Sequence, residues 1–244
     1  MLVPRYVWGY LSPLSIDAVR RDGYEFYRLV PSGVMQVVVP LGGSAYTSRV
    51  QVEEALDKVL PPLVDRLAAE RPDHITLGGV PIAALAGRAR VQALLKELHE
   101  RTGIRVNNPL EAAIEALHHL KAPTVVLASR WSAQVNDAIK TYLAEGGIEL
   151  VGATERGLAP AAAVDIREGW QMSLDLGREA AQAHPDAAAI FVPGGAALSL
   201  HVVPMLEKEL GRPVLTNLTI EVWEGLIRPG VVRPIEGWGR LLAG

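Results

Sequence analysis

The sequence predicts an α/β protein made of two similar lobes, each a mostly parallel sheet flanked by helices. Short apolar runs alternate with longer helical patterns along the chain, which is typical of strand–helix alternation. A Gly-Gly pair follows an apolar run twice, at Gly78-Gly79 and at Gly194-Gly195, and a helical pattern and another apolar run follow each pair. A unit that is repeated in this way predicts two similar lobes that face each other, with a cleft between the two Gly-Gly turns.

The expected strands are short, continuous apolar runs, which are typical of parallel strands covered by helices on both faces of a sheet. In chain order they comprise residues 6–11, 35–39, 74–77, 104–106, 124–128, 149–151, 188–192 and 214–216. Strands that are separated by helices are joined by right-handed crossovers, so both sheets should be parallel.

The expected helices are the longer segments between these strands. They comprise residues 48–70, 82–101, 109–120, 131–145, 164–184, 197–210 and 219–227. The clearest helix start is at Asn108-Pro109, because asparagine is favoured at the N-cap and proline at the first helical position. Glu111 completes a capping box there. The chain has no Gly/Ser-rich linker, and we expect lobe one to comprise 1–108 plus 217–244 and lobe two to comprise 109–216.

Composition excludes several classes of function. The chain has 244 residues, 49% of them hydrophobic and 21% charged, with a net charge of −3 and no basic stripe, so nucleic acid is not an expected partner. No apolar stretch reaches about 18 residues and the first residues do not resemble a signal peptide, so we expect no membrane contact and a cytoplasmic location. The chain has no cysteine, which rules out disulfides and thiolate metal sites. Long apolar helices make a homo-oligomer reasonable.

Ligands of open α/β sheets lie at the carboxyl ends of the strands, and this rule selects the candidate site. The Gly-Gly turns offer close backbone approach and free N–H groups at a helix start, which favour an anion such as a carboxylate. The alternative is that the glycines have a structural role alone and only form tight turns between strand and helix. The predicted substrate-binding residues are Ser12, Pro13, Gly78, Gly79, Val80, Trp131, Gly194, Gly195 and Asn217. Ser129 and Arg130 are expected near the cleft, with no role assigned.

Tyr46 is the predicted catalytic residue. It lies in the polar segment 42–47 after the second strand, and it is the only phenol that we expect at the cleft. The alternative is that this segment is an ordinary polar loop. No pair of histidines or carboxylates has metal-ligand spacing, and neither Gly-Gly turn matches a dinucleotide or phosphate-binding fingerprint. We therefore expect neither a metal nor an organic cofactor.

Several longer motifs carry a resemblance to a known family. They include Ala128-Ser-Arg-Trp-x-x-x-Val-Asn136, Gly194-Gly195-x-x-x-x-Leu200, Gly211-Arg-Pro-Val-Leu, Trp223 and Gly237-Trp-Gly-Arg-Leu-Leu. On these residues the chain resembles the aspartate/glutamate racemase superfamily, and within it the arylmalonate decarboxylase and maleate isomerase branch. The resemblance implies two α/β lobes related by a pseudo-dyad, with the active site in the cleft between them.

The resemblance also implies that the usual chemistry of this family is altered here. The family places catalytic cysteines at positions that correspond to Gly79 and Gly194, and the decarboxylases use hydroxyls where this chain has Val80, Pro81 and Trp131. Two hypotheses follow. The first is a lyase of the decarboxylase type, independent of cysteine and cofactors, that acts on a small carboxylate. The second is a binding protein for small carboxylates that has lost catalysis.

Overall fold

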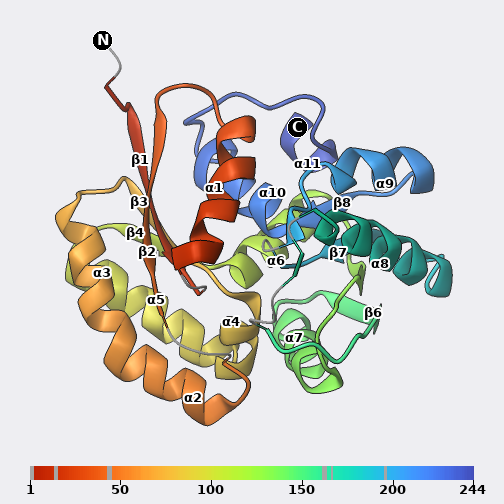
Figure 1. Ribbon diagram of the computed structural model, residues 1–244, viewed down its shortest axis with the longest axis horizontal. Coiled ribbons are helices and arrows are strands. Elements are labelled where there is room, and N and C mark those ends of the chain that lie inside the picture. Colours follow the sequence, from red (N-terminus) through yellow and green to blue (C-terminus); the bar gives the residue numbers. More distant parts are fainter. Residues whose placement is uncertain (1–2, 14–15, 43–45, 161–163, 166, 195–196) are drawn as a thin grey trace.

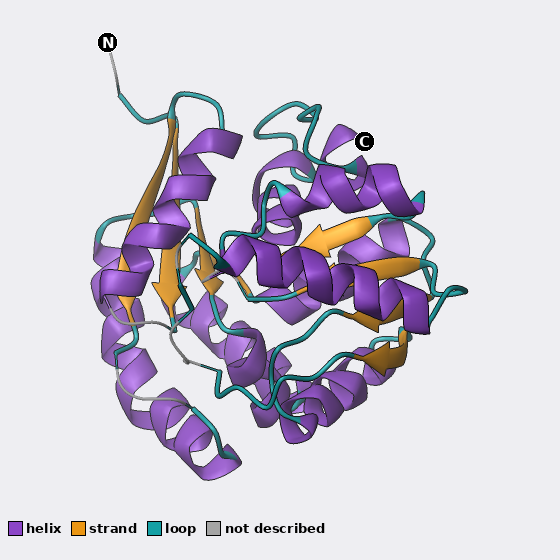
Figure 2. Cartoon of the chain, turned by 45° about the vertical axis from the view of Figure 1, so that its right-hand side comes forward, coloured by secondary structure: helices purple, strands orange, loops and turns teal. Residues whose placement is uncertain are grey.

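The computed structural model describes residues 3–13, 16–42, 46–160, 164–165, 167–194 and 197–244, and within them the chain forms two four-stranded sheets (Figures 1 and 2). The first sheet has the order β2-β1-β3-β4 and the second has the order β6-β5-β7-β8, and all strand pairs are parallel. The strands are β1 (Tyr6–Ser12), β2 (Val34–Pro40), β3 (His74–Leu77), β4 (Arg105–Asn107), β5 (Thr124–Leu127), β6 (Glu149–Ala153), β7 (Ala189–Val192) and β8 (Val214–Thr216). The two orders are equivalent strand for strand, which confirms the predicted fold.

Helices cover both sheets, and most of the predicted ones are present. They are α1 (Ile16–Leu29), α2 (Arg49–Glu54), α3 (Leu60–Ala69), α4 (Val80–Ala86), α5 (Arg88–Thr102), α6 (Pro109–His119), α7 (Ala133–Glu145), α8 (Gly169–Ala183), α9 (Val202–Leu210), α10 (Asn217–Val222) and α11 (Arg240–Ala243). Two π-helical segments, η1 (Ala55–Val59) and η3 (Trp223–Ile227), continue α2 and α10.

The helix predictions need five corrections. Helix α1 was not predicted, because Gly23 and several charged residues interrupt its apolar pattern. The predicted helix 82–101 is two helices, since Gly87 adopts φ +85° and ends α4. The predicted helix 197–210 begins only at Val202, and the predicted helix 164–184 begins at Gly169. The short helix α11 was also not predicted.

A shared hydrophobic core joins the two sheets. Strands β3 and β7 are buried along their whole length, and the larger apolar cluster includes Trp8 of the first sheet and Phe191 of the second. Helix α1 contributes Phe26 to this cluster, with its ring edge-on to Trp8 at a centroid distance of 5.2 Å. Burial of large side chains from both sheets holds the lobes together. The division into 1–108 plus 217–244 and 109–216 stays a prediction.

His74 is buried at the start of β3, at the opposite end of this strand from the Gly-Gly turn. The Tyr6 hydroxyl lies 2.8 Å from its Nδ1, and the Trp8 ring packs against it in a tilted arrangement with 4.7 Å between ring centroids. Its Nε2 has no hydrogen-bond partner among the described residues. Burial lowers the pKa of His74 to about 3, and the charge of Arg105 adds to this effect.

We expect His74 to destabilise the fold as the pH falls. In the unfolded chain its imidazole gains a proton below about pH 6.5, whereas the buried ring resists protonation down to about pH 3, so the stability contribution is complete above pH 6.5 and is lost below it. In urea unfolding between pH 6.5 and 4, the free energy of unfolding of the wild type should fall by about 1.4 kcal/mol per pH unit more steeply than that of His74→Asn. Parallel pH curves for the two proteins would contradict this prediction.

Candidate functional site

A cavity of about 80 Å³ lies between the two sheets at the carboxyl ends of their strands. Its walls come from both sheets and from α1, α4 and α10, so this is the position that the strand-end rule predicts. The lining residues are Tyr10, Pro13, Glu25, Phe26, Gln36, Tyr46, Gly79, Val80, Pro81, Ile82, Arg130, Trp131, Pro160, Gly194, Asn217, Leu218 and Glu221.

The turn after β3 provides an apolar wall of this cavity. Gly79 has φ +111° and is the N-cap of α4, and Val80, Pro81 and Ile82 follow it as buried residues. Pro81 has no N–H group, and α4 is only seven residues long, so this turn offers a weak anion site. The first Gly-Gly turn therefore contributes shape and apolar surface.

The equivalent turn after β7 is organised differently. Gly194 has φ +99°, and its N–H donates to Oδ1 of Asn217, the first residue of α10, over 3.2 Å. The next α-helix, α9, begins only at Val202, so Gly194 does not start a helix as the sequence analysis expected. Gly195 lies outside the described residues. The anion cradle expected from the backbone of this turn therefore stays a prediction.

A cation occupies the space beside Gly194 instead. The Arg130 guanidinium lies against this glycine so closely that a Cβ at position 194 would be 2.7 Å from its Nη1. Arg130 is 5% exposed and follows β5, and its guanidinium carbon lies 5.7 Å from the Trp131 ring centroid. Among the described residues, its Nε has no hydrogen-bond partner and no carboxylate forms an ion pair with it. Burial lowers the pKa of Arg130 to about 10, so it remains a cation at neutral pH.

Trp131 closes the cavity beside this cation. It is 2% exposed, and its backbone N–H donates to Ser129 Oγ over 3.0 Å. A single parallel bridge to Leu158 places Trp131 before α7, so the predicted helix start at 131 is wrong. The buried guanidinium and the indole together form a polar and aromatic wall that suits a planar anion.

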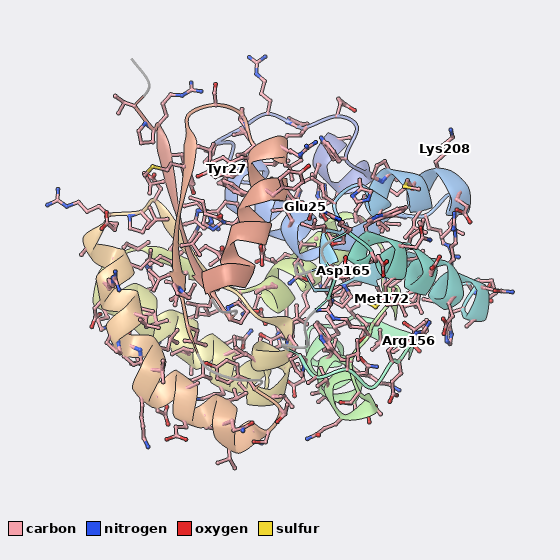
Figure 3. All side chains as sticks on the ribbon, in the orientation of Figure 1. Glu25, Tyr27, Arg156, Asp165, Met172 and Lys208 are labelled. Carbon is pink, nitrogen blue, oxygen red and sulfur yellow. The ribbon has the colours of Figure 1, made fainter. Side chains whose placement is uncertain are left out.

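Two buried carboxyl groups also line the cavity. Glu25 projects from α1 toward the second sheet (Figure 3), and its Oε1 accepts the Leu200 N–H over 2.9 Å. Glu221 lies on α10, one turn after Asn217, and is 5% exposed. Carboxyl groups inside a cleft are candidates for proton transfer.

The phenol groups differ from the prediction. Tyr46 lines the cavity, but its hydroxyl donates to the Gly42 carbonyl over 2.6 Å, and burial raises its pKa above the usual value. Both effects weaken Tyr46 as a proton donor. It is also not the only phenol, because Tyr10 lines the same cavity with its hydroxyl beside Gly78.

The structure brings most of the predicted binding residues together and leaves two outside. Pro13, Gly79, Val80, Trp131, Gly194 and Asn217 line the cavity with Tyr46. Ser12 is fully buried and does not line it, and Gly78 lines a smaller, apolar cavity of about 30 Å³ that shares Gly79 and Ile82 with the first.

No three His, Asp or Glu side chains gather to hold a metal ion in the described part of the chain. No helix there could cross a membrane.

Sequence reasoning did not assign a role to Arg130 and did not select Glu25 or Glu221 at all. Arg130 stands next to Trp131 at a strand end, so the strand-end rule was enough to place it. Glu25 depends on a helix that the pattern did not reveal, and Glu221 lies a full turn beyond its strand end.

Comparison with known proteins agrees with this geometry. The family model described as arylmalonate decarboxylase matches residues 45–242. The arylmalonate decarboxylase of Bordetella bronchiseptica is 27% identical over 237 residues, covering 96% of this chain and 95% of that protein. A crystal structure of a liganded arylmalonate decarboxylase, in which a glycine is replaced by cysteine and a cysteine by serine, has a TM-score of 0.83 at 26% identity and covers 97% of this chain and 98% of that one.

A second group of solved structures shares the fold. The maleate cis-trans isomerase of Nocardia farcinica, in a cysteine-to-serine variant with a covalently bound succinylcysteine intermediate, has a TM-score of 0.81 at 18% identity, with 97% of each chain covered. These relatives are enzymes. The family match spans most of the chain and the fold agrees with it, so this protein belongs to the arylmalonate decarboxylase family.

Proposed function

We propose that this protein is a lyase of the decarboxylase type that acts on a small carboxylate substrate, independently of cysteine and of cofactors. The observation that carries the proposal is the buried Arg130 guanidinium, which faces a mostly apolar cavity and has no carboxylate partner among the described residues. A cation that is held out of water without a counter-ion favours the binding of an anion.

The cavity suits the loss of carbon dioxide from a dicarboxylate. Arg130 would hold one carboxylate, and the apolar wall of Val80, Pro81 and Ile82 would surround the other with a surface that disfavours its charge. When the bond between this second carboxyl group and the α-carbon breaks, carbon dioxide leaves. The electron pair stays on the α-carbon and the retained carboxylate as an enediolate. The fixed guanidinium would stabilise this developing charge.

The lack of cysteine favours this reaction over isomerisation. The isomerase relative is described with a covalent succinylcysteine intermediate, and such an adduct needs a thiol that this chain does not have. Decarboxylation needs a group that binds the anion and a group that donates one proton. Neither group has to be a thiol. The carboxyl groups in the cavity also favour an enzyme over the alternative of a pure binding protein, because binding alone does not require a proton donor.

Proton NMR in D₂O tests the reaction directly, with purified protein and a panel of arylmalonates, alkylmalonates, maleate and hydroxy-diacids. We expect at least one malonate to lose a carboxyl group and to gain deuterium at the α-carbon, because the anion formed must take a proton from an exchangeable group. If no compound is consumed while ligand line broadening persists, the lyase proposal is wrong and the binding-protein alternative holds.

Substitution of Arg130 tests the anion anchor. Arg130→Met should weaken the binding of a malonate by about ten- to a hundredfold, since charge-assisted hydrogen bonds contribute about 1.5–3 kcal/mol each. It should also raise the stability of the ligand-free protein, because an uncompensated buried charge is removed. Calorimetry and thermal unfolding measure the two effects, with Arg178→Met as the control, since Arg178 forms only surface ion pairs. Unchanged malonate affinity would contradict the proposed anchor.

A further inference from the structure

We infer that Glu221 is the general acid of this site and delivers the proton that completes the reaction. The inference rests on the proposed decarboxylation and names the group that takes over proton transfer in a chain with no thiol. It is carried by the position of Glu221 on α10, where it lines the same cavity as Arg130.

Contacts link the anion anchor to α10, the helix that carries Glu221. The Arg130 guanidinium lies against Gly194, and the Gly194 N–H donates to Asn217 Oδ1 over 3.2 Å. Asn217 and Glu221 are four residues apart on α10, so their side chains lie on the same helix face, about 5–6 Å apart at Cβ. Both residues line the cavity. Glu221 therefore shares its helix face with Asn217, and it shares the cavity with Arg130.

The fold keeps α10 in a fixed orientation. Thr216 and Thr219 form a capping box at its start, and both side chains are fully buried. Glu221 is therefore held on a well-anchored helix. A proton donor needs such a fixed position, because it must reach one particular carbon atom.

Other groups in the cavity are less suited to this step. The Tyr46 hydroxyl is already donated to the Gly42 carbonyl, and the Tyr10 hydroxyl lies beside Gly78, at the turn of the first sheet. The Glu25 carboxylate accepts the Leu200 N–H, which ties α1 to the loop before α9. No histidine lines the described cavity. Glu221 is the cavity carboxyl group on α10, the helix to which Gly194 hydrogen-bonds through Asn217.

The proton balance of the step is simple. The proposed step uses the carboxylic acid form of Glu221, which carries the proton to be transferred. After carbon dioxide has left, the proton passes from the Glu221 oxygen to the α-carbon of the enediolate, and the monocarboxylate product forms. Glu221 remains as a carboxylate and regains its proton from water when the product leaves.

The test measures proton transfer separately from decarboxylation. The protein is incubated in D₂O with the monocarboxylate product of a malonate, and NMR follows exchange of the α-proton, which is the reverse of the proposed step. Glu221→Gln should slow both this exchange and kcat for the malonate by about 10²–10³-fold, since general acid catalysis contributes about 10²–10⁴-fold. Malonate affinity should fall by no more than about threefold, as Arg130 is unchanged.

Two further variants control for structural effects. Glu221→Asp keeps a carboxylic acid, so its rate of α-proton exchange should stay well above that of Glu221→Gln. The pH dependence of kcat should also shift relative to the wild type. Glu224→Gln neutralises another buried carboxyl of the same helical segment, which pairs with Arg105 and does not line the cavity. It should leave exchange within about threefold of the wild type.

The outcomes separate this inference from the proposed function. If the wild type decarboxylates a malonate and Glu221→Gln exchanges the α-proton at the wild-type rate, Glu221 is not the acid, although the lyase proposal stands. Loss of exchange in Glu25→Gln with normal exchange in Glu221→Gln would assign the step to Glu25. If the wild type neither decarboxylates nor exchanges, both proposals are wrong.

Discussion

The site depends on the contact between the Arg130 guanidinium and the backbone of Gly194. A pKa lowered from 12.5 to about 10 corresponds to roughly 3 kcal/mol against the charged form, so holding this cation between the sheets costs stability in the absence of a ligand. Glycine is required at position 194, because the backbone has φ +99° and a Cβ would meet the guanidinium at 2.7 Å. The position that the family resemblance associates with a thiol is thus filled by a cation from the neighbouring strand.

The duplicated topology explains how such distant residues meet. Both sheets have the same strand order, and the carboxyl ends of β3 and β7 face a common cavity. The two turns have nevertheless diverged. The turn at Gly79 leads directly into α4 and forms an apolar wall, whereas the turn at Gly194 packs against Arg130 and hydrogen-bonds to Asn217. One side of the cavity is therefore suited to excluding water and the other to holding an anion, and this asymmetry is what a decarboxylation needs.

Helix α1 completes the cavity from the first sheet. It places Phe26 in the shared core and Glu25 against the Leu200 amide, so a single helix links the sheets through an apolar contact and a buried hydrogen bond. These two contacts fix where Phe26 and Glu25 lie in the cavity wall.

The sequence by itself determined the strands, their parallel arrangement and the duplicated Gly-Gly turns, because each strand is a short apolar run between turn residues and this signal is local. It also determined that no thiol takes part. Only the tertiary structure decided which strand-end residues share the cavity, that Ser12 and Gly78 lie outside it, and that Arg130, Glu25 and Glu221 lie within it. Such long-range contacts depend on how the two sheets pack and on the orientation of α1 and α10, and no local pattern encodes these. The chemistry of a buried charge is set by its neighbours in space, which the order of residues along the chain does not reveal.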